Sequence, residues 1–201
     1  TMSIKKTLTN LTESKDTIIV AFGDSLTQGW MEPKGYVDFL KEMIESKFIN
    51  PKFSIINKGI PGDTASGGLS RCKKDVIIHN PDLTIIQFAL NDMFIGMSEI
   101  EFYNNTKAII KIIQSQTESE IILTTSVSLE NPGERSLSES FYKKLFELSQ
   151  EYNTAYTEVH SYWDAIIKNG VNRDLLVQYD RVHPTVEGYK LMAEAIFSIF
   201  E

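Results

Sequence analysis

Short apolar runs alternate with helical patterns along the chain. The runs are continuous rather than alternately apolar and polar, which is typical of parallel strands that are buried on both faces. They cover Ile18 to Phe22, Phe53 to Ile56, Leu83 to Phe88, Ile121 to Leu123 and, more weakly, Ala155 to Thr157. The pattern therefore predicts five buried strands.

The segments between these runs repeat their apolar residues with a period of about 3.6, which predicts amphipathic helices. Such stripes occupy residues 36–44, 141–152 and 189–200. Two capping-box sequences, Ser98 to Glu101 and Ser136 to Glu139, predict where two helices begin. Strands that alternate with helices favour an α/β fold with one open, mostly parallel sheet between helices. We expect a single domain over residues 1–201, in which residues 1–16 form a peripheral N-terminal segment.

Charge and composition narrow the range of partners. The net charge of −7 gives no electrostatic attraction to phosphate backbones or anionic lipid, so nucleic acid is not an expected partner. No run approaches the roughly 18 apolar residues of a membrane span, and no apolar segment follows Lys5 and Lys6. We therefore expect a cytoplasmic protein that does not insert into membranes. No apolar stripe exceeds the needs of a core, which leaves the oligomeric state open.

Sheets of this kind bind ligands beyond the carboxyl ends of their strands, so we expect the chemistry just after the apolar runs. The first run ends in Gly23-Asp24-Ser25. At this point Ser25 can serve as a nucleophile, provided that a base lies within hydrogen-bond reach. On this segment alone, a role as a helix cap or turn residue fits the serine equally well.

His183 is the best candidate for that base among the three histidines of the chain. Asp180 precedes it by three residues, so a carboxylate in a tight turn can hold one ring nitrogen while the other faces the nucleophile. His79 lies before a proline at a helix end, which favours a capping role. His160 follows the weak strand and fits a surface or packed position better than a site.

Ester cleavage also needs hydrogen-bond donors for an oxyanion. Gly62 follows the second run and precedes a helix, so its amide can be one of the unpaired donors of that helix end. Asn91 follows the third run with a side-chain NH2 group. Asp24, Asp63 and Asp92 lie near the same edge, where they can hold a metal or order loops, and we expect the second role. No nucleotide-binding glycine motif and no histidine pair with zinc spacing occur, so we expect neither a cofactor nor a metal.

Four sequence blocks resemble those of the GDSL, or SGNH, hydrolase family: GDSLTQG, GIPGDT, ALND and DRVHP. The resemblance implies a flavodoxin-like three-layer α/β/α fold with a five-stranded sheet. It also implies that Ser25 is the nucleophile, His183 the base and Asp180 its partner. The Ser25 amide, the Gly62 amide and the Asn91 side chain then form the oxyanion hole. The third block usually opens with glycine, where this chain has Ala89, a small change that we do not expect to disable the site.

These observations predict a metal-free serine esterase that cleaves a small-molecule acyl ester through an acyl-enzyme. Trp30, Met93, Phe94 and Ile95 are the candidate lining of an acyl pocket. The loop from Ser128 to Arg135 is polar and contains no long apolar lid. This favours substrates with short acyl groups on polar carriers, such as O-acetylated sugars. Two alternatives stay open: a lysophospholipase or thioesterase acting on longer chains, and a non-catalytic binding module on the same fold.

Overall fold

A five-stranded parallel sheet forms the centre of the computed structural model, which describes residues 4–201. Its order is β2-β1-β3-β4-β5, and every neighbouring pair of strands is parallel. The strands span Thr17–Gly23 (β1), Phe53–Gly59 (β2), Leu83–Gln87 (β3), Glu120–Thr124 (β4) and Ala155–Thr157 (β5). The five predicted strands are therefore confirmed and differ from the observed ones only at their ends.

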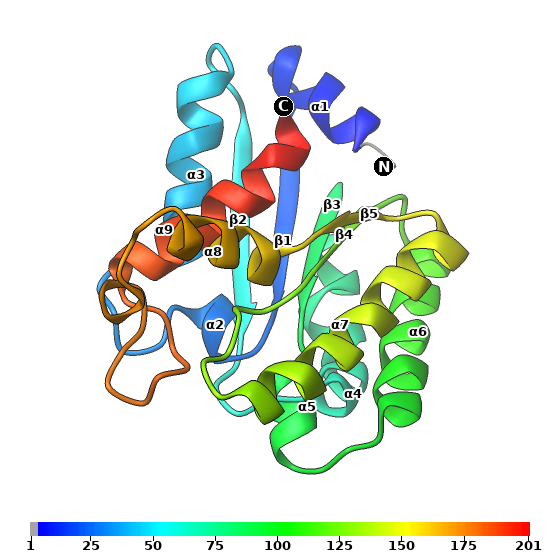
Figure 1. Cartoon of the computed structure of the whole chain (residues 1–201). Coiled ribbons are helices and arrows are strands. Elements are labelled where there is room, and N and C mark those ends of the chain that lie inside the picture. Colours follow the sequence, from blue (N-terminus) through cyan, green and yellow to red (C-terminus); the bar gives the residue numbers. More distant parts are fainter. Residues whose placement is uncertain (1–3) are drawn as a thin grey trace.

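Helices cover both faces of the sheet, which gives the predicted three-layer α/β/α arrangement (Figure 1). On one face α3 (Tyr36–Lys47), α8 (Val159–Lys168) and α9 (Val186–Phe197) pack together. The other face carries α4 (Ala65–Asp75), α6 (Glu99–Gln116) and α7 (Pro132–Tyr152). The short elements are α1 (Lys5–Thr12), α2 (Ser25–Gln28), α5 (Leu90–Phe94), η1 (Ile77–His79), η2 (Arg173–Leu175) and η3 (Ser198–Phe200).

The predicted stripes are the faces that these helices turn toward the sheet. Tyr36, Leu40 and Ile44 of α3 are fully buried, as their spacing requires. The central strands β1 and β3 are buried along almost their whole length, whereas the edge strand β2 is half-buried. Continuous apolar runs therefore mark the strands that are covered on both faces.

One of the two predicted helix starts is confirmed. Ser98 and Glu101 form a capping box at the beginning of α6. The second start, at Ser136, is wrong because α7 begins earlier at Pro132. There the side chain of Asn131 accepts hydrogen bonds from the Gly133 and Glu134 amides, at 2.9 and 3.1 Å. Proline fits the first helical position, so Asn131 and Pro132 together start the helix before Ser136 is reached.

The N-terminal segment is more integrated than we expected, although residues 1–3 lie outside the described residues. Ile4, just before α1, and Leu11, within it, are both buried in the core. The amides of Lys6 and Thr7 donate to the carboxylate of Glu120, at 3.0 and 2.8 Å. Across residues 4–201, no helix combines the length and the apolar composition that a membrane crossing requires.

The strand order creates a switch point between β1 and β3. From β1 the chain crosses to β2 on one side and then returns to β3 on the other. Gly23 at the end of β1 is paired with Gly59 of β2 and with Gln87 of β3. The segments that follow these three strands therefore leave the sheet at one level, where sheets of this type bind their ligands.

Ala89 has a strained backbone at this edge. Its φ of 142° lies in a region that favours glycine, and the resembling family has glycine at this place in the block. Ala89 follows β3 and precedes α5, so the strain falls at the junction that carries Asn91.

Replacing Ala89 with glycine should therefore stabilise the protein. Backbone strain of this kind costs roughly 1–3 kcal/mol, and the greater freedom of an unfolded glycine offsets about 0.4–1 kcal/mol of that gain. A net gain of about 1 kcal/mol should raise the thermal midpoint by roughly 2–4 °C. Calorimetry of Ala89→Gly measures it, with Ala108→Gly in the ordinary helix α6 as a control that should lower the midpoint. A fall in both variants would show that Ala89 is not strained.

Candidate active site

Ser25 lies directly beyond β1, at the first position of α2. The carboxylate of Asp24 caps this helix by accepting the Leu26 amide at 2.9 Å. Gly29 ends the helix after a single turn with a φ of 86°, which only glycine adopts easily. The main chain therefore fixes Ser25 at the carboxyl edge of the sheet between two defined helix ends.

His183 and Asp180 meet Ser25 from the other end of the chain. Ser25 Oγ lies 2.8 Å from His183 Nε2, and His183 Nδ1 lies 2.5 Å from Asp180 Oδ2. Partial burial raises the pKa of the Asp180 carboxyl, but hydrogen bonds from His183 and the Val182 amide outweigh it and leave the pKa below its usual value. An ionised Asp180 keeps a proton on Nδ1, so Nε2 is the nitrogen that can accept a proton from Ser25.

The loop that carries His183 is held by a short ladder of its own. Val177 and Pro184 form a β-bridge, and the Gln178 amide donates to the His183 carbonyl at 2.7 Å. The side chain of Gln178 donates to the carbonyls of Trp30 and Pro184, both at 2.8 Å. Gln178 thus connects the loop that carries His183 to Trp30, in the segment that follows α2. Sequence reasoning missed it because bonds from a side-chain amide to main-chain carbonyls leave no pattern along the chain.

The three expected oxyanion donors follow adjacent strands. The Ser25 amide opens α2 and has no acceptor within that helix. Gly62 lies in the turn before α4, outside the helix, and its φ is 76°. Within residues 4–201 its amide has no acceptor, so the turn and not the helix end leaves this donor available. Asn91 Nδ2 donates to the Asp63 carbonyl at 2.8 Å, which leaves its second hydrogen free to point elsewhere.

The carboxylates at this edge order loops, as expected. Asp92 Oδ1 accepts the Ala65 amide at 2.8 Å, at the start of α4. Burial raises the pKa of Asp24 to about 7 and that of Asp92 to about 6, although the hydrogen bonds from Leu26 and Ala65 act in the opposite direction. In the part of the chain that the structure describes, no three side chains of the metal-binding types are grouped to hold an ion.

A hollow of about 490 Å³ lies beside the Asp180 loop. Its lining combines apolar and charged side chains, from Phe94, Leu129, Glu130, Asn131, Pro132, Glu134, Asp180, Arg181 and Val182. The guanidinium of Arg181 pairs with Glu130 at 2.8 Å and with Asp174 at 2.6 Å. Residues of the polar loop after β4 therefore supply one wall of this hollow.

The four candidate acyl-pocket residues are placed differently from one another. Phe94 lines the hollow and is exposed, as is its neighbour Ile95. Trp30 is partly exposed, and its ring centre lies 6.1 Å from that of His183. Met93 is 5% exposed and belongs to the core, so it does not line an open surface. Glu130 belongs to the polar loop already noted in the sequence, whereas sequence reasoning missed Arg181 at this hollow.

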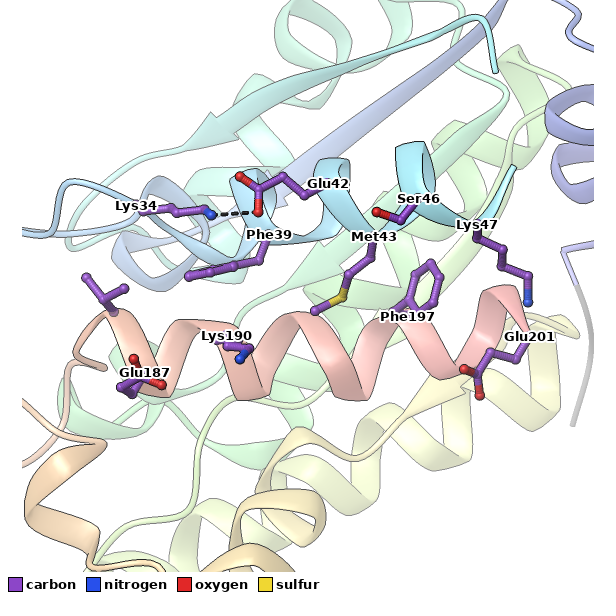
Figure 2. A pocket seen from close by; sticks show the side chains of 11 residues that line it. Lys34, Phe39, Glu42, Met43, Ser46, Lys47, Glu187, Lys190, Phe197 and Glu201 are labelled. Carbon is purple, nitrogen blue, oxygen red and sulfur yellow. Dashed lines mark hydrogen bonds and ion pairs between the residues drawn. The ribbon is translucent and has the colours of Figure 1, made fainter. Parts of the chain in front are cut away.

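A larger groove, of about 850 Å³, lies between α3 and α9 (Figure 2). Phe39, Met43 and Phe197 line it together with several charged residues. Lysines cover its aromatic rings: Lys34 Nζ lies 3.9 Å from the ring centre of Phe39. None of the predicted site residues lines this groove, so size alone does not mark the site.

His160, another of the three histidines, has a packing role. His160 Nδ1 lies 2.9 Å from Thr125 Oγ1, and its ring packs against Tyr142 at 4.7 Å between ring centres. Burial lowers the pKa of His160, which keeps the ring neutral. This agrees with the expected packed position.

Comparisons with known proteins agree with the geometry. The chain is 24% identical to an acetylxylan esterase of Geobacillus stearothermophilus, over 88% of this chain and 90% of that protein, and 23% identical to an arylesterase of Vibrio mimicus, over 89% and 85%. The crystal structure of the acetylxylan esterase superposes with a TM-score of 0.84 at 20% identity, covering 92% of this chain and 94% of that one. The model of the GDSL-like lipase/acylhydrolase family matches residues 21–191. The chain therefore belongs to the GDSL-like lipase/acylhydrolase family.

Proposed function

We propose that the protein is a serine esterase in which Ser25, His183 and Asp180 form the catalytic triad. The observation that carries this proposal is the unbroken path of two short hydrogen bonds, from Ser25 Oγ to His183 and from His183 to Asp180. The related acetylxylan esterase supports it, because its catalytic mutants replace a serine, a histidine and an aspartate with alanine. A binding module on the same fold would need none of these bonds.

In the proposed reaction, His183 Nε2 takes the proton of Ser25 as Oγ attacks the ester carbonyl. The amides of Ser25 and Gly62 and the free hydrogen of Asn91 Nδ2 stabilise the resulting oxyanion. His183 then gives its proton to the departing alcohol, which leaves an acyl group on Ser25. A water molecule activated by His183 releases the acid in the second half of the cycle.

We infer that the substrate carries a short acyl group, and that O-acetylated carbohydrate is the best candidate. A long chain that entered the hollow beside Asp180 would lie against Glu130, Glu134 and Arg181, and removing water from such groups is unfavourable. The exposed indole of Trp30 beside His183 offers a flat apolar face to a sugar ring. The acetylxylan esterase among the relatives agrees with this substrate class.

Replacing Ser25 with alanine should abolish hydrolysis and leave the fold intact. The loss of one triad member typically lowers turnover by about 10⁴-fold or more. Turnover of p-nitrophenyl acetate, labelling by a fluorophosphonate probe and the thermal midpoint are measured on the same preparation. Ser140→Ala on α7 is a matched control that should keep full activity and labelling. Turnover of Ser25→Ala within tenfold of the native enzyme would remove Ser25 from the nucleophile role.

Replacing Asp180 with asparagine should lower turnover by roughly 10²–10⁴-fold. The new side-chain oxygen can still accept the Val182 and His183 amides. The NH2 group would then donate to Nδ1, so the ring proton moves to Nε2. With a proton already on it, Nε2 cannot accept the proton of Ser25. Asp174→Asn, which changes a second carboxylate near Arg181, should have little effect on kcat. Nearly native turnover in Asp180→Asn would show that another group orients His183.

The specificity constant should fall as the acyl chain of a p-nitrophenyl ester lengthens from acetate to octanoate. In a fully apolar groove, the six additional methylenes of octanoate would instead favour the longer ester by about 5 kcal/mol, or roughly three and a half decades. Glu130→Leu removes one charge from the hollow and should shift the preference toward longer esters. A specificity constant that climbs steadily to octanoate in the native enzyme would point to a lysophospholipase or thioesterase.

A further inference from the structure

Arg71 of α4 makes hydrogen bonds that connect the segments following β1 and β2 at the active-site edge. Its Nε donates to Asp63 Oδ2 at 2.7 Å, and one of its terminal nitrogens donates to the Gly23 carbonyl at 2.9 Å. The other terminal nitrogen donates to the Lys58 carbonyl at 2.9 Å and to Asp75 Oδ2 at 3.1 Å. A single guanidinium therefore links the end of β1, the end of β2 and the residue after Gly62.

The surroundings of Arg71 favour a fixed position. Its side chain is only 12% exposed, and those of Asp63 and Asp75 are 13% and 11% exposed. The guanidinium carbon lies 4.4 Å from the ring centre of Phe22, which closes one face. A buried, planar group that is bonded to three separate segments, and to Asp75 of its own helix, holds those segments at fixed distances from one another.

Asp63 connects this cluster to the oxyanion donors. It follows Gly62 directly, and its carbonyl accepts Asn91 Nδ2 at 2.8 Å. Gly23, which accepts from Arg71, also accepts the Ile60 amide at 3.0 Å and lies two residues before Ser25. Two of the three expected donors thus depend on the place of Asp63, which Arg71 ties to the strand that carries the nucleophile.

We propose that Arg71 is a positioning residue that holds the Gly62 amide and the Asn91 side chain in register with Ser25. The proposal rests on the serine-esterase function proposed above. Arg71 does not touch the substrate, so its loss should weaken stabilisation of the transition state more than binding of the ester. Misplacement of catalytic groups by a change outside the reacting centre can cost about 10²-fold in rate.

Gly67 offers a way to test this link while Arg71 stays in place. An added Cβ at Gly67 would lie 1.8 Å from Asp63 Oδ1, so alanine must displace the end of that side chain. Alanine is otherwise favoured over glycine in a helix, and Gly67 lies in the first turn of α4. Gly67→Ala should therefore disturb the bond between Asp63 and Arg71 without unfolding the protein.

The experiment compares Arg71→Met, Arg71→Lys and Gly67→Ala with the native enzyme on p-nitrophenyl acetate. We expect kcat to fall roughly 10–100-fold in Arg71→Met, with KM within about threefold. Arg71→Lys should lose less, because an ammonium can still pair with Asp63 but cannot reach all the carbonyls. Gly67→Ala should also lose kcat at a nearly native thermal midpoint. Glu120→Ala removes two hydrogen bonds at the opposite end of the sheet and should lower only the midpoint.

Inhibition by methylboronic acid tests whether the loss of kcat arises at the oxyanion donors. The boron accepts Ser25 Oγ to form a tetrahedral adduct, the serine proton moves to His183, and a boron-bound oxygen faces the oxyanion donors. The inhibition constant should rise in proportion to the fall in kcat for the Arg71 and Gly67 variants. Unchanged inhibition, or kcat within threefold in both Arg71→Met and Gly67→Ala, would overturn the positioning role. If the Arg71 variants do not fold, Gly67→Ala decides. An active Ser25→Ala variant would instead refute the proposed function itself.

Discussion

The hydrogen bond between Ser25 Oγ and His183 Nε2 joins residues that are 158 positions apart in the chain. It can form only if β1 ends at the right level in the sheet and the loop before α9 returns to that level. A slip of one residue in the pairing of β1 would move Ser25 by about 3.3 Å, which exceeds the 2.8 Å length of the bond itself. The register that pairs Gly23 with Gly59 and with Gln87 therefore constrains the proposed triad as well as the sheet.

Burial and ion pairing reduce the negative charge of the three aspartates that follow the strands at the active-site edge. An ionised carboxylate close to the oxyanion would oppose the charge that develops there. Burial raises the pKa of Asp24 to about 7 and that of Asp92 to about 6, so both carry less negative charge near neutral pH than exposed aspartates do. The negative charge of Asp63 is instead balanced by the guanidinium of Arg71, whose Nε lies 2.7 Å from Asp63 Oδ2. The same residues can thus order the loops by hydrogen bonding while opposing the proposed oxyanion less than exposed carboxylates would.

The sequence predicted the sheet and the proximity of Asp180 to His183 well, because both depend on patterns that are local or strongly ordered. The five apolar runs correspond to the five strands of the sheet. The three-residue spacing of Asp180 and His183 already implied that their side chains could lie in contact. The sequence did not predict Arg71 or Gln178, because their partners are main-chain carbonyls whose positions exist only after folding. The start of α7 was missed for another reason: a competing cap at Asn131 outweighed the capping box at Ser136.

The structure separates the groups that would perform catalysis from those that would choose the substrate. The expected catalytic groups follow strands or lie in a loop closed by main-chain bonds, so their positions depend on the core. The wall of the hollow depends instead on the Arg181 and Glu130 side chains, which are 41% and 53% exposed. Exposed ion pairs contribute little to stability, typically about 0–1 kcal/mol. In the proposed esterase, changes in this wall should therefore alter the preferred ester while the geometry of the three triad side chains stays the same.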